Sequence, residues 1–247
     1  MENNTIQLMP PNEHWYWSVK KKCWYPSVTT VTSYLPKGKF FEKYLAEQDS
    51  YEDAKRILKE AGERGTHCHE ASEVLDKGGE LKYGLCGLND DEYKLMIGYV
   101  NWHKKYTPEI FQDKIELPLI SDKMKLGGTA DRIYNIDGKL TLFDLKTSKS
   151  AIYDSHWIQV ACYSEMYEEL YKTQIDQVAI LRLTPKRKDG YEYVVRSREE
   201  WKMDYKQFKN TYETMVYLNG GKEFKPNVIE VPEILTLNTV IKNSDVV

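Results

Sequence analysis

The pattern of apolar and polar residues is most informative between residues 125 and 147, where apolar positions flank an Asp137–Gly138 pair on both sides. An Asp-Gly pair in this setting is the strongest short-range signal for a two-residue hairpin loop. With these two residues as the loop, Ile136 faces Lys139, and this one pairing sets the register of the whole hairpin. The pattern therefore predicts two antiparallel strands in a fixed register.

The predicted register places two carboxylates opposite each other. Asp131 faces Asp144, and Lys146 lies two residues further along on the face of Asp144. Facing residues have Cβ atoms about 5 Å apart, where like charges are destabilising. Apolar residues populate both faces of the hairpin, so we expect these acids to be partly buried, which is costly for uncompensated carboxylates. A hairpin with solvated charges is the alternative, and we favour a site suited to metal-assisted phosphodiester hydrolysis.

Periodicity along the rest of the chain predicts alternating helices and strands. Helices are expected from Ser27 to the break at Pro36 and at about residues 40–48, 51–76, 90–105, 155–171 and 198–218. Strands are expected at about 109–119, 125–147, 176–184 and 191–196, with a short hairpin at 14–25 and an irregular tail from Gly220. One α/β domain over residues 1–247 is the simplest interpretation, with a helical front at about 26–107 and a core at about 109–218.

Composition sets limits on the class of protein. The chain has 247 residues, of which 41% are hydrophobic and 30% charged, a balance typical of soluble globular proteins. We see no apolar run of the ~20 residues that span a bilayer and no signal peptide, so we expect a cytoplasmic location and no membrane partner. The four cysteines form no Cys-x-x-Cys pair and are expected to be reduced. A net charge of −3 argues against a strongly basic protein that coats nucleic acid without acting on it, but it does not argue against a nuclease.

A helix face around His69 is the second candidate site. Gly62 and Gly65 lie on this face one turn apart, so a ligand or another backbone can come close. Glu73 lies four residues after His69 and can act together with it. A lone helical histidine is more often structural, but beside the hairpin acids we expect His69 to be a metal ligand. His67 lies on the other side of the helix and is expected to be structural.

Gln159 and Tyr163 are also four residues apart on a predicted helix. On their own they are best explained as part of an amphipathic core helix with one buried amide. The alternative is that both residues contact a phosphate or orient Lys146.

Aromatic and basic residues gather in the predicted hairpin at 15–25. This segment can stack single-stranded bases while Lys20, Lys21 and Lys22 neutralise phosphates. An aromatic cluster packed for stability explains the same residues equally well.

Four segments together resemble motifs of the PD-(D/E)XK nuclease superfamily, in its RecB-like exonuclease branch. They are Arg64-Gly-Thr-x-x-His69, Gly128-Thr-Ala-Asp131, Asp144-Leu-Lys146 and Gln159-x-x-x-Tyr163. Pro26-Ser-Val-Thr29 also resembles the front end of phage-encoded members and of mitochondrial genome maintenance exonucleases. Each motif is weak alone, but four in this order over about residues 26–171 are specific; the last 50 residues or so resemble nothing known to us.

The resemblance implies a restriction-endonuclease-like α/β fold, with a central mixed β-sheet flanked by helices. It implies that the metal ligands are His69, Asp131, Asp144 and the main-chain carbonyl of Leu145. It implies that Lys146, with Asp131 and Asp144, is catalytic. The remaining candidates are Gln159, Tyr163, Arg64 and Thr147 for substrate binding, and Glu73 and Glu116 as further acids.

The resemblance also implies an activity and its cofactors. We expect a DNA exonuclease that uses one or two Mg²⁺ or Mn²⁺ ions and acts in recombination or repair. We expect it to favour single-stranded DNA or DNA ends, because the aromatic and basic residues at 15–25 can stack bases without reading their sequence. No iron–sulfur cluster is expected, because some relatives hold one with three cysteines after the core and none follows Cys162 here. Any unwinding would need a helicase or recombination protein as partner, and a phage-encoded chain would act in the host cytoplasm. A non-catalytic DNA-binding module and an endonuclease of the same superfamily are the alternatives.

Overall fold

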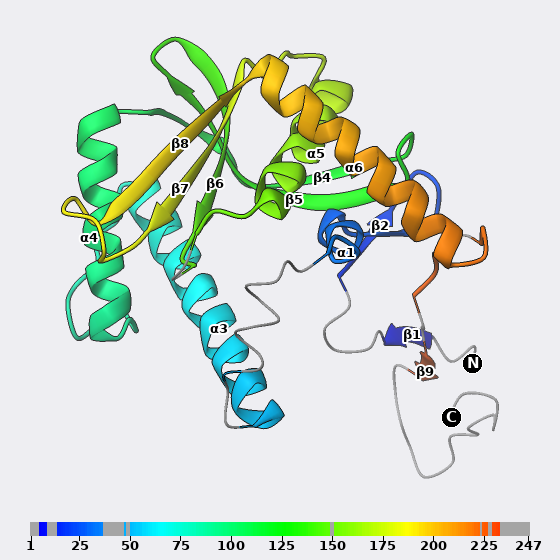
Figure 1. The fold of residues 1–247 in the computed structure, drawn as a ribbon, viewed down its shortest axis with the longest axis horizontal. Coiled ribbons are helices and arrows are strands. Elements are labelled where there is room, and N and C mark those ends of the chain that lie inside the picture. The colour runs from blue at the N-terminus through cyan, green and yellow to red at the C-terminus, as the bar shows by residue number, and fades with distance from the viewer. Residues whose placement is uncertain are drawn as a thin grey trace.

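A five-stranded mixed sheet lies at the centre of the fold, with helices on both faces (Figure 1). The computed structural model describes residues 5–8, 14–36, 47, 50–148, 151–222, 224–226 and 229–232. The sheet has the order β4–β5–β6–β7–β8 and comprises β4 (Glu109–Ser121), β5 (Leu126–Ile136), β6 (Lys139–Lys146), β7 (Gln177–Leu183) and β8 (Tyr191–Ser197). Neighbouring strands are antiparallel except β6 and β7, which are parallel. This arrangement confirms the expected restriction-endonuclease-like α/β core.

The other elements precede, connect or follow these strands. The helices are α1 (Val28–Thr32), α3 (Tyr51–Asp76), α4 (Asp90–Tyr106), α5 (Asp154–Tyr171) and α6 (Arg198–Leu218). Two further pairs of strands are β2 (Trp15–Ser18) with β3 (Cys23–Pro26), and β1 (Thr5–Leu8) with β9 (Ile229–Pro232). Helix α5 connects the parallel strands β6 and β7, as such a pair requires a crossover.

Two apolar clusters cover the two faces of the sheet. Helices α1, α5 and α6 pack on one face, around Ile133 and Leu142 of the hairpin. Helices α3 and α4 pack on the other face, where Trp102 is fully buried and lies 4.8 Å from the ring of Phe143. Both faces of the hairpin are therefore covered, as its sequence predicts, and its acids Asp131 and Asp144 are withdrawn from bulk water.

The hairpin of β5 and β6 has the predicted register. Asp137 and Gly138 have φ values of 53° and 75°, and two left-handed residues are what a tight two-residue loop requires. Ile136 pairs with Lys139, and the ladder continues to Arg132 opposite Phe143. The next position along this ladder places Asp131 opposite Asp144.

Helix ends follow the capping signals in the sequence. The predicted bounds 51–76 and 198–218 are those of α3 and α6, whose first turns are capped by Ser50 and Ser197. Helix α4 begins with a capping box between Asn89 and Glu92. Capping residues mark the helix ends because their side chains form hydrogen bonds with backbone N–H groups that the helix itself leaves unpaired.

The structure does not confirm two of the sequence expectations, the irregular tail and the helix at 40–48. The tail was expected to be irregular, and this is wrong for β9, which pairs antiparallel with β1; a short strand without a turn signal gives no local pattern to read. The expected helix at 40–48 lies outside the described residues apart from residue 47.

No helix in the part of the chain that the structure describes is both long and apolar enough to cross a bilayer. The cytoplasmic location stays a prediction.

Candidate metal centre

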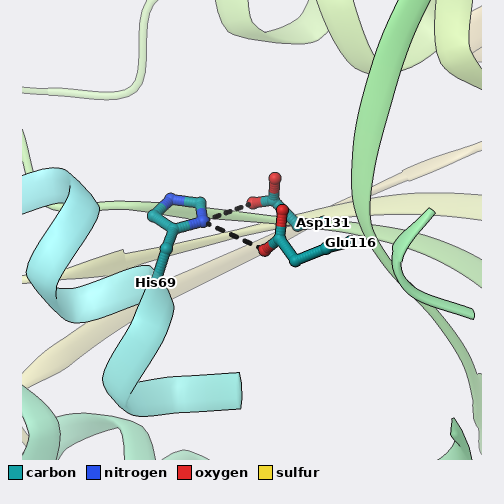
Figure 2. Close-up of side chains that lie close together, drawn as sticks. All are labelled: His69, Glu116 and Asp131. Atoms are coloured by element: carbon teal, nitrogen blue, oxygen red, sulfur yellow. Dashed lines mark ion pairs between the residues drawn. The ribbon is translucent and has the colours of Figure 1, made fainter. Parts of the chain in front are cut away.

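Three side chains from three different elements meet at one point (Figure 2). His69 comes from α3, Glu116 from β4 and Asp131 from β5. His69 Nδ1 lies 3.5 Å from Asp131 Oδ2 and 3.7 Å from Glu116 Oε1. One ligand atom from each residue lies within 4.8 Å of the other two. The site therefore joins a helix to two neighbouring strands.

A shift in the pairing of β4 precedes Glu116, whose own backbone is left-handed. The pairing of β4 with β5 shifts between Ile110 and Ile115, and Glu116 has a φ of 47°. Its two neighbours pair with Arg132 and Ala130, so Glu116 lies opposite Asp131. A non-glycine residue in the left-handed region is uncommon, and bulges occur where a strand must re-aim a side chain.

The main chain of Leu145 connects the histidine to the aspartate. Its N–H donates a 2.8 Å hydrogen bond to Asp131 Oδ2, and its carbonyl oxygen lies 3.0 Å from His69 Nε2. The ring tautomer that donates from Nε2 satisfies the second contact. Leu145, implied as a main-chain ligand by the resemblance, thus borders the cluster.

Asp144 and Lys146 form a pair beside the cluster. Lys146 Nζ donates a 2.9 Å hydrogen bond to Asp144 Oδ1 and lies 2.8 Å from Oδ2. Asp144 is 1% exposed. Burial raises its pKa to about 6, with the charge of Asp131 adding to the rise and Lys146 opposing it. Burial alone would lower the pKa of Lys146, but Asp144 and Asp131 outweigh it and raise that pKa.

The carboxylates also act on His69. Burial alone would lower the pKa of His69, but the charge of Asp131 and the contact with Glu116 outweigh it and raise that pKa. The cluster thus carries excess negative charge that favours a cation.

A buried arginine anchors α3 to the sheet beneath the cluster. Arg132 is 0% exposed, and its guanidinium donates to Asp76 at 2.8 Å and to Ser72 at 2.6 Å. Asp76 also accepts hydrogen bonds from the hydroxyls of Tyr99 at 2.6 Å and Tyr134 at 2.9 Å. The charge of Arg132 is therefore compensated inside the protein.

The same guanidinium contacts all three residues of the cluster. It donates to the Glu116 carboxylate at 2.7 Å, to the main-chain oxygen of Asp131 at 3.0 Å and to that of His69 at 3.5 Å. Planar guanidinium donors fix the orientation of the groups they bind. Sequence reasoning missed Arg132, although a charged residue inside a buried strand is a signal for a compensated ion.

The predicted substrate residues lie around the cluster rather than in it. Gln159 Nε2 donates to Tyr163 OH at 3.2 Å, and a Cβ on Gly128 would lie 2.3 Å from the Tyr163 ring. Glycine at this position thus allows α5 to approach β5. Thr147 is buried, and its Oγ1 would lie 3.7 Å from a Cβ on Gly65 of α3.

The other three predicted residues have separate surroundings. The Nε atom of Arg64 is buried and has no hydrogen-bond partner among the described residues. Glu73 pairs with Lys77 at 2.5 Å on the surface of α3. His67 contacts the buried Glu92 of α4 at 2.9 Å, the structural role expected for it.

An open cavity of about 630 Å³ gives access to the cluster. It is lined by His14, Thr29, Gly65, Thr66, His69, Glu70, Glu73 and Glu116. Three of these are glutamates, so an anionic ligand entering here would need a cation to bind next to them.

The structure thus brings together His69 and Asp131, as expected, and adds Glu116, which was only a weak candidate. It pairs Asp144 with Lys146 instead of placing it in the same cluster. No local sequence signal marks Glu116, because the shift in pairing that precedes it depends on contacts with β5.

The donor atoms suit a divalent cation. Ligand atoms lie about 2.0–2.5 Å from the ion they bind, so two ligand atoms of one ion can be at most about 5 Å apart. The ligand atoms of His69, Glu116 and Asp131 all lie within 4.8 Å of one another and therefore meet this condition. The carboxylate of Asp144, which is paired with Lys146, offers a further oxygen ligand beside the cluster. Carboxylate and carbonyl oxygens suit Mg²⁺ and Mn²⁺, and Mn²⁺ tolerates the imidazole better.

Comparison with known proteins identifies one family. The family model described as "PD-(D/E)XK nuclease superfamily" matches residues 14–229. No curated protein matches the chain significantly. Seventeen chains of solved structures match, among them one described as "Crystal structure of SSO0001", with 18% identity over 66% of this chain and 74% of that chain and a TM-score of 0.31. A similarity of that size carries no argument about function.

Proposed function

Because the chain belongs to the PD-(D/E)XK nuclease superfamily, we propose that it is a divalent-metal-dependent DNA exonuclease. The observation that carries the proposal is the meeting of His69, Glu116 and Asp131 beside the Asp144–Lys146 pair. Members of this superfamily are generally nucleases that use divalent metals, so DNA is the expected substrate. The RecB-like branch, the lack of an iron–sulfur cluster and a helicase or recombination partner are finer parts of the proposal, supported by the order of the motifs and the spacing of the cysteines.

The residues have separate roles in the proposed hydrolysis. His69, Glu116, Asp131 and Asp144 would hold the ion, together with the carbonyl of Leu145. A bound divalent ion lowers the pKa of a coordinated water and stabilises the attacking and leaving oxygens. Lys146 carries a positive charge at the same site, where it can stabilise the charge that develops on the phosphate.

The surrounding residues would orient the substrate. Gln159 and Tyr163 are bonded to each other on α5 next to Gly128, and Thr147 directly follows Lys146. We propose that Gln159, Thr147 and Arg64 contact the DNA backbone while the buried Tyr163 orients Gln159. Both helix layers pack on one sheet, which supports a single nuclease domain.

Replacement of Asp131 should weaken metal binding. Asp131→Ala removes a carboxylate that faces His69 and accepts from Leu145, so we expect the Kd for Mn²⁺ to rise at least tenfold. Isothermal titration calorimetry measures it, with Asp113→Ala as the control because Asp113 is an exposed aspartate on the same sheet. If Asp131→Ala and the wild type bind Mn²⁺ with equal affinity, Asp131 is not a metal ligand. The same measurement on Asp144→Ala and Glu116→Gln tests the other two acids.

A closed single-stranded circle separates the exonuclease from an endonuclease. We expect degradation of linear single-stranded DNA in Mn²⁺ or Mg²⁺ while the circle stays intact, because an exonuclease needs an end. Electrophoresis of both substrates after the same incubation measures this. Cutting of the circle would identify an endonuclease of the same superfamily.

A further inference from the structure

Two lysine-rich turns lie next to each other on the side of the molecule where β2 and β3 pack. The β2–β3 turn carries Lys20, Lys21 and Lys22, all exposed. Its backbone is held by Lys22 N–H, which donates to the Ser18 carbonyl at 2.7 Å, and by Lys21 N–H, which donates to Ser18 Oγ at 3.0 Å. The turn is thus a defined structure that presents its lysines to solvent.

The β4–β5 turn adds two more exposed lysines, Lys123 and Lys125. Asp122 joins the two turns, because its Oδ1 accepts hydrogen bonds from Ser18 Oγ at 2.5 Å and from Tyr25 OH at 3.2 Å. The bond from Ser18 lowers the pKa of Asp122, and the charges of nearby Lys20 and Lys21 lower it further. We call Lys20, Lys21, Lys22, Lys123 and Lys125 the lysine platform.

The charge of the platform contrasts with that of the chain. Residues 14–26 contain no acidic residue, and residues 121–130 contain only Asp122. Glu169 of α5 is also close to the β4–β5 turn, where it accepts a 2.6 Å hydrogen bond from Ser121 Oγ. The whole chain has a net charge of −3. A local concentration of positive charge on an acidic protein attracts polyanions to one place on its surface.

The platform is connected to the metal centre. Tyr16 of β2 packs so closely on Gly127 that a Cβ there would lie 2.2 Å from its side chain, and its hydroxyl lies 3.2 Å from Thr129 Oγ1. Lys125 directly precedes β5 and lies six residues before Asp131, about 20 Å at the usual strand rise.

Along β2, the exposed Trp17 lies between His14, which lines the cavity at the cluster, and the lysine turn. Trp17 of β2 follows the inward-facing Tyr16 and therefore points outward, with 39% of its surface exposed. Its ring packs edge-on against Trp24, 5.1 Å away, which fixes its orientation. A rigid exposed indole is a stacking surface for an unpaired base.

We propose that the lysine platform and Trp17 bind the single DNA strand that leads to the metal centre, with phosphates on the lysines and a base on Trp17. The inference rests on the proposed nuclease function and adds the path of the substrate. A strand bound in this way spans about 20 Å between the platform and the scissile phosphate. Substrates too short to reach the platform gain nothing from it.

The test measures DNA binding without cleavage, in EDTA, by fluorescence anisotropy of labelled oligo(dT) at several KCl concentrations. Lys20→Ala/Lys123→Ala removes one lysine from each turn. We expect weaker binding of a 30-mer and a salt slope reduced by about 1.4, because each phosphate contact on a single strand contributes about 0.7. Trp17→Ala should weaken binding of the single strand but not of a duplex.

The matched control is Lys186→Ala/Lys188→Ala, which removes two exposed lysines from the turn between β7 and β8. We expect this variant to keep the wild-type affinity and slope. Equal affinities and slopes for the platform variant and the control would overturn the proposal. Thermal unfolding of each variant shows whether the hairpin remains folded, and Lys20→Gln/Lys123→Gln provides a second neutral replacement.

Cleavage measurements separate this inference from the proposed function. In Mn²⁺, the platform variant should show a raised KM with an unchanged kcat on the 30-mer, and wild-type parameters on a dinucleotide, which is too short to reach the platform. Cleavage by the wild type together with unchanged binding by the platform variant would reject the platform alone. A folded wild type that neither binds nor cleaves DNA would reject both.

Discussion

Lys146→Ala is expected to lower the rate of DNA cleavage by at least about a hundredfold, the usual cost of removing one preorganised charge from an active site. Lys146 is the cation that pairs with the buried Asp144. Its loss removes the positive charge at the reacting phosphate and lets the pKa of Asp144 rise further, since Lys146 holds that pKa down. Single-turnover cleavage of an end-labelled oligonucleotide measures the rate.

DNA binding by the Lys146→Ala variant should stay close to wild type, because Lys146 supplies only one of many contacts with phosphate. Lys139→Ala is the matched control, since Lys139 is an exposed lysine at the other end of the same strand. We expect it to cleave at the wild-type rate. Wild-type cleavage by Lys146→Ala would contradict its catalytic role.

Arg132→Met is expected to lower the free energy of unfolding by about 3–5 kcal/mol, the cost of breaking a buried ion pair by removing one partner. The substitution leaves Asp76 without its cation in the protein interior. It also removes the donor that orients Glu116, so we expect Mn²⁺ affinity to fall by about 10–100-fold, as for other groups that orient metal ligands. Urea unfolding followed by circular dichroism measures the first effect, and calorimetry the second.

Two variants show whether these effects are specific to Arg132. Arg56→Met removes exposed ion pairs with Asp53 and Glu60 on α3 and should leave the unfolding midpoint almost unchanged. Tyr99→Phe removes a hydrogen bond to Asp76 but leaves Arg132 and its bond to Glu116 in place, so it should destabilise the fold without changing Mn²⁺ affinity. An unfolding midpoint of Arg132→Met equal to that of Arg56→Met would contradict the account of the buried pair.

Part of the site could be predicted from sequence because one short turn motif determines which residues of two strands face each other. The Asp137–Gly138 loop sets the register of β5 and β6, and a register determines which side chains face each other along the whole hairpin. Helical spacing likewise gave the bounds of α3 and the face that carries His69. These features depend on interactions between residues close in the sequence.

The remaining features depend on contacts between distant residues. Glu116 follows a shift in the pairing of β4 with β5, and no turn residue marks it. Strand β9 forms only because β1 lies beside it. Arg132 is joined to α3 by hydrogen bonds, and Asp122 joins the two lysine turns. The residues in these contacts are far apart in the sequence, so no short motif predicts them.

The most direct test of the central claim is the metal dependence of DNA hydrolysis. Wild-type protein is incubated with end-labelled linear single- and double-stranded DNA in Mg²⁺, in Mn²⁺ or in EDTA, with Asp131→Ala in parallel. We predict loss of linear DNA in Mg²⁺ or Mn²⁺, faster for the single strand, and no loss in EDTA or with the variant. Intact DNA in both metals, with folded protein still binding it, would contradict the account and favour a non-catalytic DNA-binding module on a nuclease fold.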